Sequence, residues 1–169
     1  MANYIPISTV TVGSGGATNI DFINIPQTYT DLVIKISARS TSGAAFAGLI
    51  ITPNGNTANY TFRWLGDANG GAVSYTQAAF GYNHLFYIPG SAATASTFGN
   101  GEITIPNYTS ANNKSISADG ANQNNASAVY QGMSAGLWSN TAPITSISLT
   151  TGSSFVQYST ATLYGIRKY

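Results

Sequence analysis

The stretch that decides the fold is Asp31-Leu32-Val33-Ile34-Lys35-Ile36-Ser37-Ala38-Arg39. Every second side chain in it, beginning at Leu32, is apolar, and the positions between them are mostly charged or polar. This two-residue period is that of a β-strand with one face in a core and the other in water. Residues 144–150 repeat the pattern, so we expect an all-β protein.

Strand signals extend over most of the chain. Further strands are expected near residues 4–12, 18–24, 46–52, 60–65, 82–88, 100–105, 114–118, 127–137 and 155–166. Dense turn signals separate them, including Ser14-Gly15-Gly16, Asn100-Gly101 and Asp119-Gly120. Short strands between frequent turns predict an antiparallel β-sandwich with a jelly-roll-like topology, formed as one domain over residues 1–169.

Two stretches lack a strand pattern. They are residues 66–81 and 107–127, and the second is expected to be a strand-poor surface loop. Short helical turns are expected near 74–80 or 91–97. Proline gives a separate signal, because it ends ladder pairing and forces extended geometry on the residue before it. We therefore expect a strand end at each of four Ile-Pro pairs: Ile5-Pro6, Ile25-Pro26, Ile88-Pro89 and Ile105-Pro106.

Charge is scarce in this chain of 169 residues. Only 7% of residues are charged, with 6 Lys plus Arg against 5 Asp plus Glu, whereas about 25% is usual in soluble domains. Six scattered cations cannot form the basic face that binding to a nucleic-acid backbone or a membrane surface requires. Since the polar surface must then consist of hydroxyl and amide groups, the composition is typical of a protein that packs against other proteins.

The residue types needed for catalysis are sparse. There is no cysteine, and His84 is the only histidine. It lies in an aromatic segment, and no Gly-x-Ser-x-Gly turn accompanies it. The five carboxylates are scattered, with no metal-ligand spacing and no phosphate-binding loop. We therefore expect no enzyme activity, no cofactor and no metal.

Aromatic side chains give two open interpretations. Seven of them, Tyr60, Phe62, Trp64, Tyr82, Phe86, Tyr87 and Trp138, could include a platform on which sugars stack. The preferred interpretation is that they belong to the core and to subunit interfaces, where Tyr and Trp are favoured. The predicted interface residues are Tyr4, Ile5, Tyr60, Trp64, Tyr82, His84, Tyr87 and Trp138.

Three segments carry a resemblance to a known family. They are residues 29–40, the turn Trp138-Ser139-Asn140-Thr141-Ala142-Pro143-Ile144 with the strand after it, and residues 155–166, which close on Leu163-Tyr164-Gly165-Ile166. Together they resemble the small virion structural proteins of tailed bacteriophages. The resemblance implies a jelly-roll-like β-sandwich that serves as a building block of the virion and brings no catalytic residues.

The resemblance leaves two positions on the particle open. A capsid decoration (cement) protein is expected first, because the chain enters a strand at once and has no heptad stalk. The resemblance to such proteins implies a homotrimer that binds the major capsid protein. The alternative is a tail fibre or tail-tip module that binds a receptor or a carbohydrate. The N-terminal arm is expected either to add a strand to a neighbour's sheet or to pair within its own.

Overall fold

The computed structural model describes residues 3–68, 70–80, 83–123 and 130–167. Within these ranges the chain has strands and no helix, so the expectation of an all-β fold is confirmed. The strands are β1 (Asn3–Thr11), β2 (Ala17–Phe22), β3 (Asp31–Ala38), β4 (Phe46–Pro53), β5 (Tyr60–Ala68), β6 (Gly71–Phe80), β7 (Asn83–Pro89), β8 (Gly99–Pro106), β9 (Lys114–Asn122), β10 (Tyr130–Trp138), β11 (Ile147–Phe155) and β12 (Thr160–Arg167).

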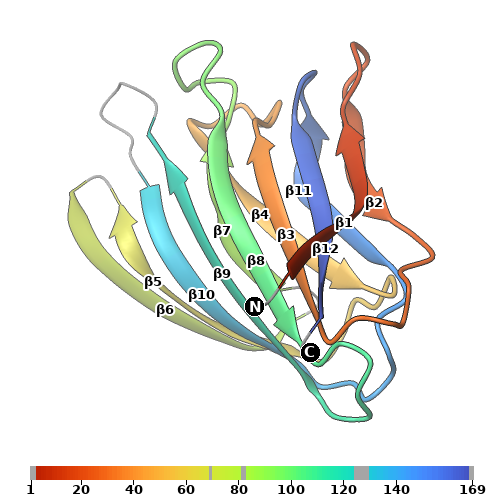
Figure 1. Cartoon of the computed structure of the whole chain (residues 1–169). Coiled ribbons are helices and arrows are strands. Elements are labelled where there is room, and N and C mark those ends of the chain that lie inside the picture. Colours follow the sequence, from red (N-terminus) through yellow and green to blue (C-terminus); the bar gives the residue numbers. More distant parts are fainter. Residues whose placement is uncertain (1–2, 69, 81–82, 124–129, 168–169) are drawn as a thin grey trace.

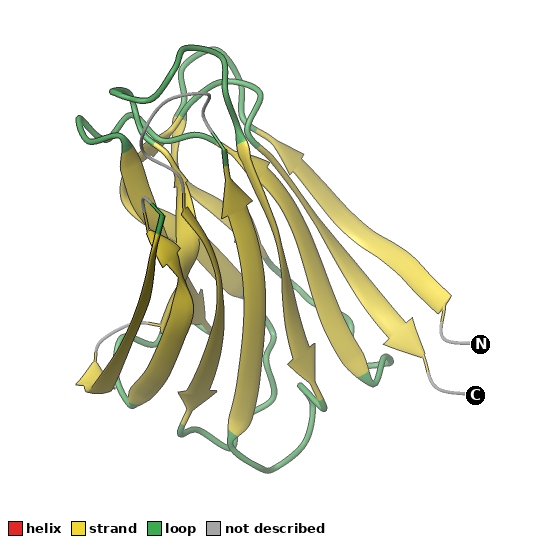
Figure 2. Ribbon diagram, turned by 90° about the vertical axis from the view of Figure 1, so that its left-hand side faces the viewer, coloured by secondary structure: helices red, strands yellow, loops and turns green. Residues whose placement is uncertain are grey.

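The strands form two packed sheets (Figure 1). The large sheet has the order β1-β12-β3-β8-β9-β10-β5-β6, and the small sheet has the order β2-β11-β4-β7. Neighbouring strands are antiparallel in both sheets, and the first five strands alternate between them. Figure 2 shows how the curved large sheet runs across the molecule, with β1 and β12 at one edge. The result is a jelly-roll-like β-sandwich, as the sequence predicts.

One half of the sandwich has a mainly aliphatic core. Here β12, β3 and β8 face β2, β11 and β4, and we call this region the aliphatic half. Its inward side chains are fully or almost fully buried and include Ile20, Leu32, Ile34, Leu49, Ile51, Ile103, Ile147, Leu149 and Leu163. The alternation in residues 31–39 therefore assigns the faces of β3 correctly.

The other half is built from rings and glycines. Here β9, β10, β5 and β6 face β7, and we call this region the aromatic–glycine half. Four glycines lie side by side on four adjacent strands, in the order Gly101, Gly120, Gly132 and Gly66. The Phe86 ring covers the first two and the Trp64 ring covers the last two, so closely that a Cβ atom at any of the four would overlap a ring.

Three expectations for local structure are wrong, and two share a cause. Asn100-Gly101 and Asp119-Gly120 were expected to be turns but lie inside β8 and β9. Neither glycine has a positive φ angle. A glycine is needed at each position because the Phe86 ring lies where a Cβ atom would be. A short helical turn was expected near residues 74–80, but these residues belong to the edge strand β6.

Proline marks strand ends at two of the four predicted places. β7 ends at Pro89 and β8 ends at Pro106, whereas β2 already ends at Phe22, before Ile25-Pro26. Pro6 lies inside β1, where the register shifts between Pro6 and Ser8. An edge strand tolerates this proline, since one side of the strand needs no ladder donor.

Candidate functional site

The predicted interface residues fall into three groups. Tyr60, Trp64 and Trp138 are almost fully buried, so they belong to the core, one of the two places expected for them, and are not displayed as interface residues. Even-numbered positions of β5 and β10 point toward the small sheet, and these large rings fill that space. Tyr60 stacks on Trp138 with ring centroids 6.3 Å apart, and Trp64 stacks on Tyr75 at 5.6 Å.

The remaining candidates are placed differently. Tyr4 is 51% exposed, and Ile5 and Tyr87 are half-buried. Tyr87 packs edge-on against Phe46 with centroids 5.0 Å apart. Tyr82 lies outside the described residues. His84 is described only through its backbone, which lies in β7 and pairs with Ile50 of β4. Among the candidates whose side chains are described, Tyr4 is the one that is more than half exposed.

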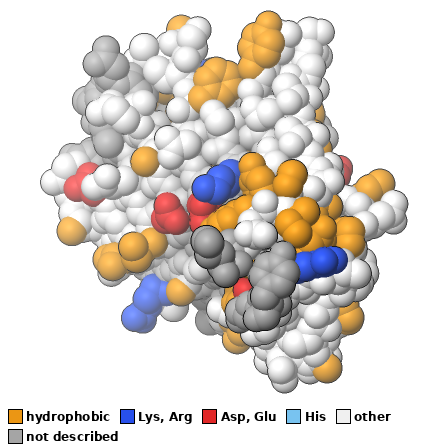
Figure 3. Space-filling model, viewed as in Figure 1, with side chains coloured by type: hydrophobic (Ala, Val, Ile, Leu, Met, Phe, Trp, Pro, Cys, Tyr) orange, Lys and Arg blue, Asp and Glu red, His pale blue; other side chains and the backbone are white. Residues whose placement is uncertain are grey.

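Tyr4 belongs to an apolar surface at the β1 edge, which we call the tyrosine patch. Its ring meets the Tyr164 ring edge-on at 5.9 Å, and the Lys35 ammonium lies 5.6 Å from its centroid. Val33 and Ile166 lie buried on the same outer face of the large sheet. In Figure 3 hydrophobic side chains gather on this part of the face, beside a blue cation.

Next to the tyrosine patch lies the one ion pair found among the described residues. Lys35 Nζ is 3.1 Å from a carboxylate oxygen of Glu102. The hydrogen bond and the charge of Glu102 raise the pKa of Lys35. Both side chains are solvated, so the pair contributes little stability. It separates the tyrosine patch from the rest of the outer face.

Two cationic side chains, Arg39 and Lys114, are buried and bind carbonyl groups of the protein itself, so they are not available to a partner protein. The buried Arg39 guanidinium donates to the carbonyls of Thr94 and Ala93 at 2.7 and 2.9 Å, and to further groups of the same loop. Buried Lys114 donates from Nζ to the carbonyls of Ser110 and Asn112, and burial lowers its pKa. The surface is therefore even poorer in charge than the composition indicates.

The carboxylates also serve local structure. Asp67 Oδ1 accepts the Gly70 N–H at 2.9 Å. Asp31 Oδ1 accepts the Asn107 N–H at 2.9 Å. In the described ranges no three His, Asp or Glu side chains lie close enough to hold a metal ion. Helices long and apolar enough to cross a bilayer are likewise absent from the part of the chain that is described.

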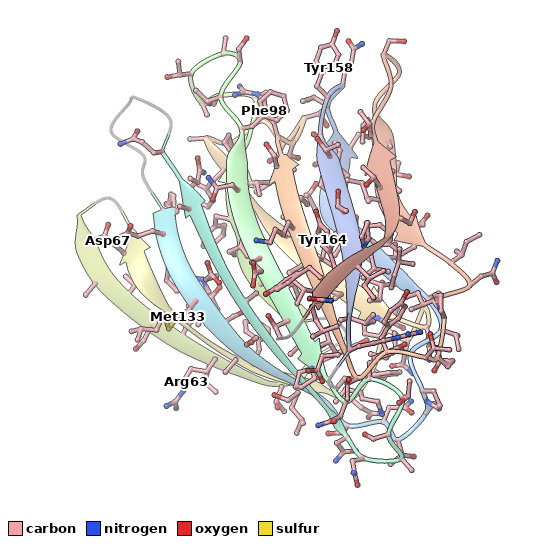
Figure 4. The ribbon with its side chains drawn as sticks, in the orientation of Figure 1. Arg63, Asp67, Phe98, Met133, Tyr158 and Tyr164 are labelled. Carbon is pink, nitrogen blue, oxygen red and sulfur yellow. The ribbon has the colours of Figure 1, made fainter. Side chains whose placement is uncertain are left out.

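A second apolar surface lies on the outer face of β10 and β5, and we call it the outer patch. It consists of Met133, Leu65 and Leu137, which are 60%, 55% and 37% exposed. Met133 and Leu65 are direct cross-strand partners. Figure 4 shows Met133 and the neighbouring Arg63 projecting from these strands.

Sequence reasoning missed the outer patch although β10 carries a signal. Residues 132–137 read Gly-Met-Ser-Ala-Gly-Leu, with the small residues Gly132, Ser134 and Gly136 inward and Met133 and Leu137 outward. A half-buried strand normally shows the reverse arrangement. The small inward residues leave room for the Trp64 ring, while the apolar outward residues have no partner in the described part of the chain that covers them.

Hollows flank the outer patch. One groove of about 550 Å³ crosses the glycine row, with Leu65 and Met133 on one side and Asp67 and Gln131 on the other. A second of about 420 Å³ lies beyond Met133 and is lined by Arg63, Asp119 and Ala135. The outer patch is thus a ridge between two shallow depressions, with charged groups of both signs nearby.

No family model matches the chain, and no curated protein matches it.

Proposed function

We propose that this chain is a structural building block of a phage particle, and specifically a decoration protein that binds the outside of an assembled capsid. The observation that carries the proposal is the outer face of the large sheet. It presents two apolar patches, one at each end, on a protein whose remaining surface is mainly polar and almost uncharged. Contiguous exposed apolar side chains of this kind mark interaction surfaces.

The tyrosine patch is the surface that we assign to the capsid. Tyr4 and Tyr164 offer apolar rings with polar hydroxyls, the combination favoured at protein interfaces. Few charges take part, so binding should depend little on salt. A subunit that binds the assembled shell but not its separated proteins stabilises the shell by mass action.

The described arm does not support strand exchange as the means of attachment. From Asn3 onward β1 pairs with β12 of the same chain, along the whole strand to Thr11. Donating β1 to a neighbour would break this ladder. Of the two expectations for the N-terminal arm, pairing within its own sheet is the one observed.

A co-sedimentation experiment tests the proposal. The purified chain is mixed with expanded capsids that lack it, and separately with dissociated capsid subunits. We expect saturable binding to the capsids alone, a higher disassembly temperature for the coated capsids, and weaker binding for Tyr4→Ser. Ile23→Ser is the matched control, since Ile23 is 72% exposed but lies after β2. Equal binding to free subunits, or no binding to capsids, would refute the proposal.

A tail-associated module that binds a carbohydrate is the second candidate. The groove over the glycine row favours it, because Asp67 and Gln131 line the groove beside apolar Met133. The stacking platform expected for such a module loses Tyr60, Trp64 and Trp138, which are buried. Inhibition of phage adsorption by the purified chain, abolished by Gln131→Ala, would support this candidate over the capsid role.

A further inference from the structure

The outer patch has the shape and polarity of a surface that binds its own copy. Its ridge, formed by Met133 and Leu65, lies between depressions of about 550 and 420 Å³. When two such faces meet around a two-fold axis close to Met133, the apolar ridge of each copy covers that of the other. A second copy therefore supplies a partner with the apolar side chains that this ridge needs.

The charges around the ridge are self-complementary. Asp119 on β9 is the cross-strand partner of Met133, and Arg63 on β5 is the partner of Ala135. The two charges thus lie on opposite sides of β10, one row apart and diagonal to each other. Both are exposed, and neither forms an ion pair with a described residue.

The diagonal arrangement of Arg63 and Asp119 is compatible with a two-fold axis between two copies. In a two-fold interface, each contact between unlike residues occurs twice. With the axis lying between the faces and crossing β10 near Met133 and Ala135, Arg63 of each copy faces Asp119 of the other. Two ion pairs then flank an apolar centre, the arrangement of a hydrophobic core with a polar rim.

The face is large enough for a stable pair. Five strands spaced about 4.8 Å apart, eight to ten residues long at about 3.4 Å per residue, cover roughly 700 Å². A standard interface buries about 800 Å² per partner. The outer face of β8, β9, β10, β5 and β6 is therefore close to the area that a specific dimer requires.

We propose that the outer patch is the interface of a two-fold homodimer, with Met133 near the axis and reciprocal Arg63–Asp119 ion pairs. The inference does not depend on the capsid contact, which uses the tyrosine patch at the other end of the sheet. It also differs from the trimer that the family resemblance implies, because a heterologous three-fold contact would not place this face against itself.

Sedimentation velocity and light scattering of the full chain measure the assembly state. We expect a dimer that dissociates on dilution, and a monomer for Met133→Glu, which buries two like charges near the axis. Ile23→Glu adds the same charge elsewhere on the surface and should stay dimeric. Unchanged melting temperatures would show that both variants fold. A monomer or a trimer of the unmodified chain, or a dimer unaffected by Met133→Glu, would overturn the inference.

A mixing experiment tests the reciprocal ion pairs. Arg63→Glu and Asp119→Arg each place two like-charged pairs in the homodimer, and each should raise its Kd by about ten-fold. Mixed one to one, the two variants restore both attractive pairs and should form a heterodimer of nearly original affinity. The advantage of the mixture should shrink at high salt. If the mixture dimerises no better than either variant alone, the two-fold assignment is wrong.

Discussion

The two halves of the sandwich solve the same packing problem in opposite ways. In the aliphatic half, branched side chains of both sheets interdigitate, and Ile34, Leu163 and Leu149 are fully buried. In the aromatic–glycine half, the Trp64 and Phe86 rings lie directly on backbone, because the strands beneath them carry glycine. One half is filled by branched side chains that interdigitate, and the other by rings that lie on glycine backbone, Phe86 from the small sheet and Trp64 from the large sheet. The first should therefore be sensitive to lost volume and the second to added volume.

The largest expected effect is a cavity in the aliphatic half. Leu163→Ala should lower the free energy of unfolding by about 3 kcal/mol, since the rigid neighbours cannot collapse into the space. Urea denaturation followed by tryptophan fluorescence measures the change. Thr162→Ala, on the opposite face of β12, should cost less than about 0.5 kcal/mol. Equal losses for the two variants would contradict the assignment of faces.

A comparable loss is expected where the aliphatic half ends, at Arg39. Its guanidinium donates to the carbonyls of Ser91, Ala93, Thr94 and Thr97. Arg39→Lys retains the charge but cannot donate to all of these carbonyl oxygens. It should lower the free energy of unfolding by about 2–3 kcal/mol. Hydrogen exchange should speed up in residues 91–97 before it does in β3. Full stability of Arg39→Lys would show that these guanidinium hydrogen bonds are not needed.

In the aromatic–glycine half, adding even one methyl group to a glycine should lower the stability of the fold. Gly120→Ala brings a Cβ into the Phe86 ring, whose own Cβ would lie 2.9 Å away, and should cost about 2 kcal/mol. Gly13→Ala is the control, since nothing lies within 4 Å of its added methyl group. In a Phe86→Leu background the cost of Gly120→Ala should fall by half or more. An unchanged cost in that background would mean that the ring does not enforce the glycine.

The smallest effect concerns the aromatic pair of β5 and β10. Tyr60→Phe removes the 3.0 Å hydrogen bond to the Asn56 carbonyl and should cost about 1 kcal/mol at neutral pH. Burial raises the pKa of Tyr60 above its usual 10.0, so the folded state keeps a proton that the unfolded chain releases. Stability should therefore be complete below pH 10 and fall as the pH rises beyond it.

The same alkaline titration has an internal control. Burial also raises the pKa of Tyr108, whose hydroxyl donates to the Pro26 carbonyl. Tyr60→Phe should reduce the alkaline loss of stability and leave the part due to Tyr108. A stability curve of Tyr60→Phe that parallels the unmodified chain above pH 10 would contradict a buried Tyr60 hydroxyl.

The contrast between the halves also explains what the sequence could predict. Where side chains fill the core from both sheets, the two-residue period shows which face is buried, as for β3. Where glycine replaces the inward side chain, the period weakens and the glycine looks like a turn, as at Gly101 and Gly120. Glycine permits positive φ and also permits a ring to lie on the backbone, and a single sequence does not separate these two uses.

The candidate surfaces follow the same division. Tyr4 could be named from the sequence because it precedes a strand pattern at an edge. Trp64 and Trp138 were predicted to lie at an interface, but they are buried. The pairing of β5 with β10 decides which side chains of these strands face inward, and that pairing joins residues about 70 positions apart. The outer patch escaped notice since its residues, Leu65, Met133 and Leu137, become neighbours only through this register.

The most direct test of the central claim, that the chain is a repeated structural unit, is its copy number in the purified particle. Quantitative mass spectrometry, with labelled peptides of this chain and of the major capsid protein, gives the ratio. We expect a fixed ratio of the same order as the capsid protein itself, lost in parallel with particle stability when the chain is deleted. A few copies per particle, confined to the tail, would contradict the capsid role.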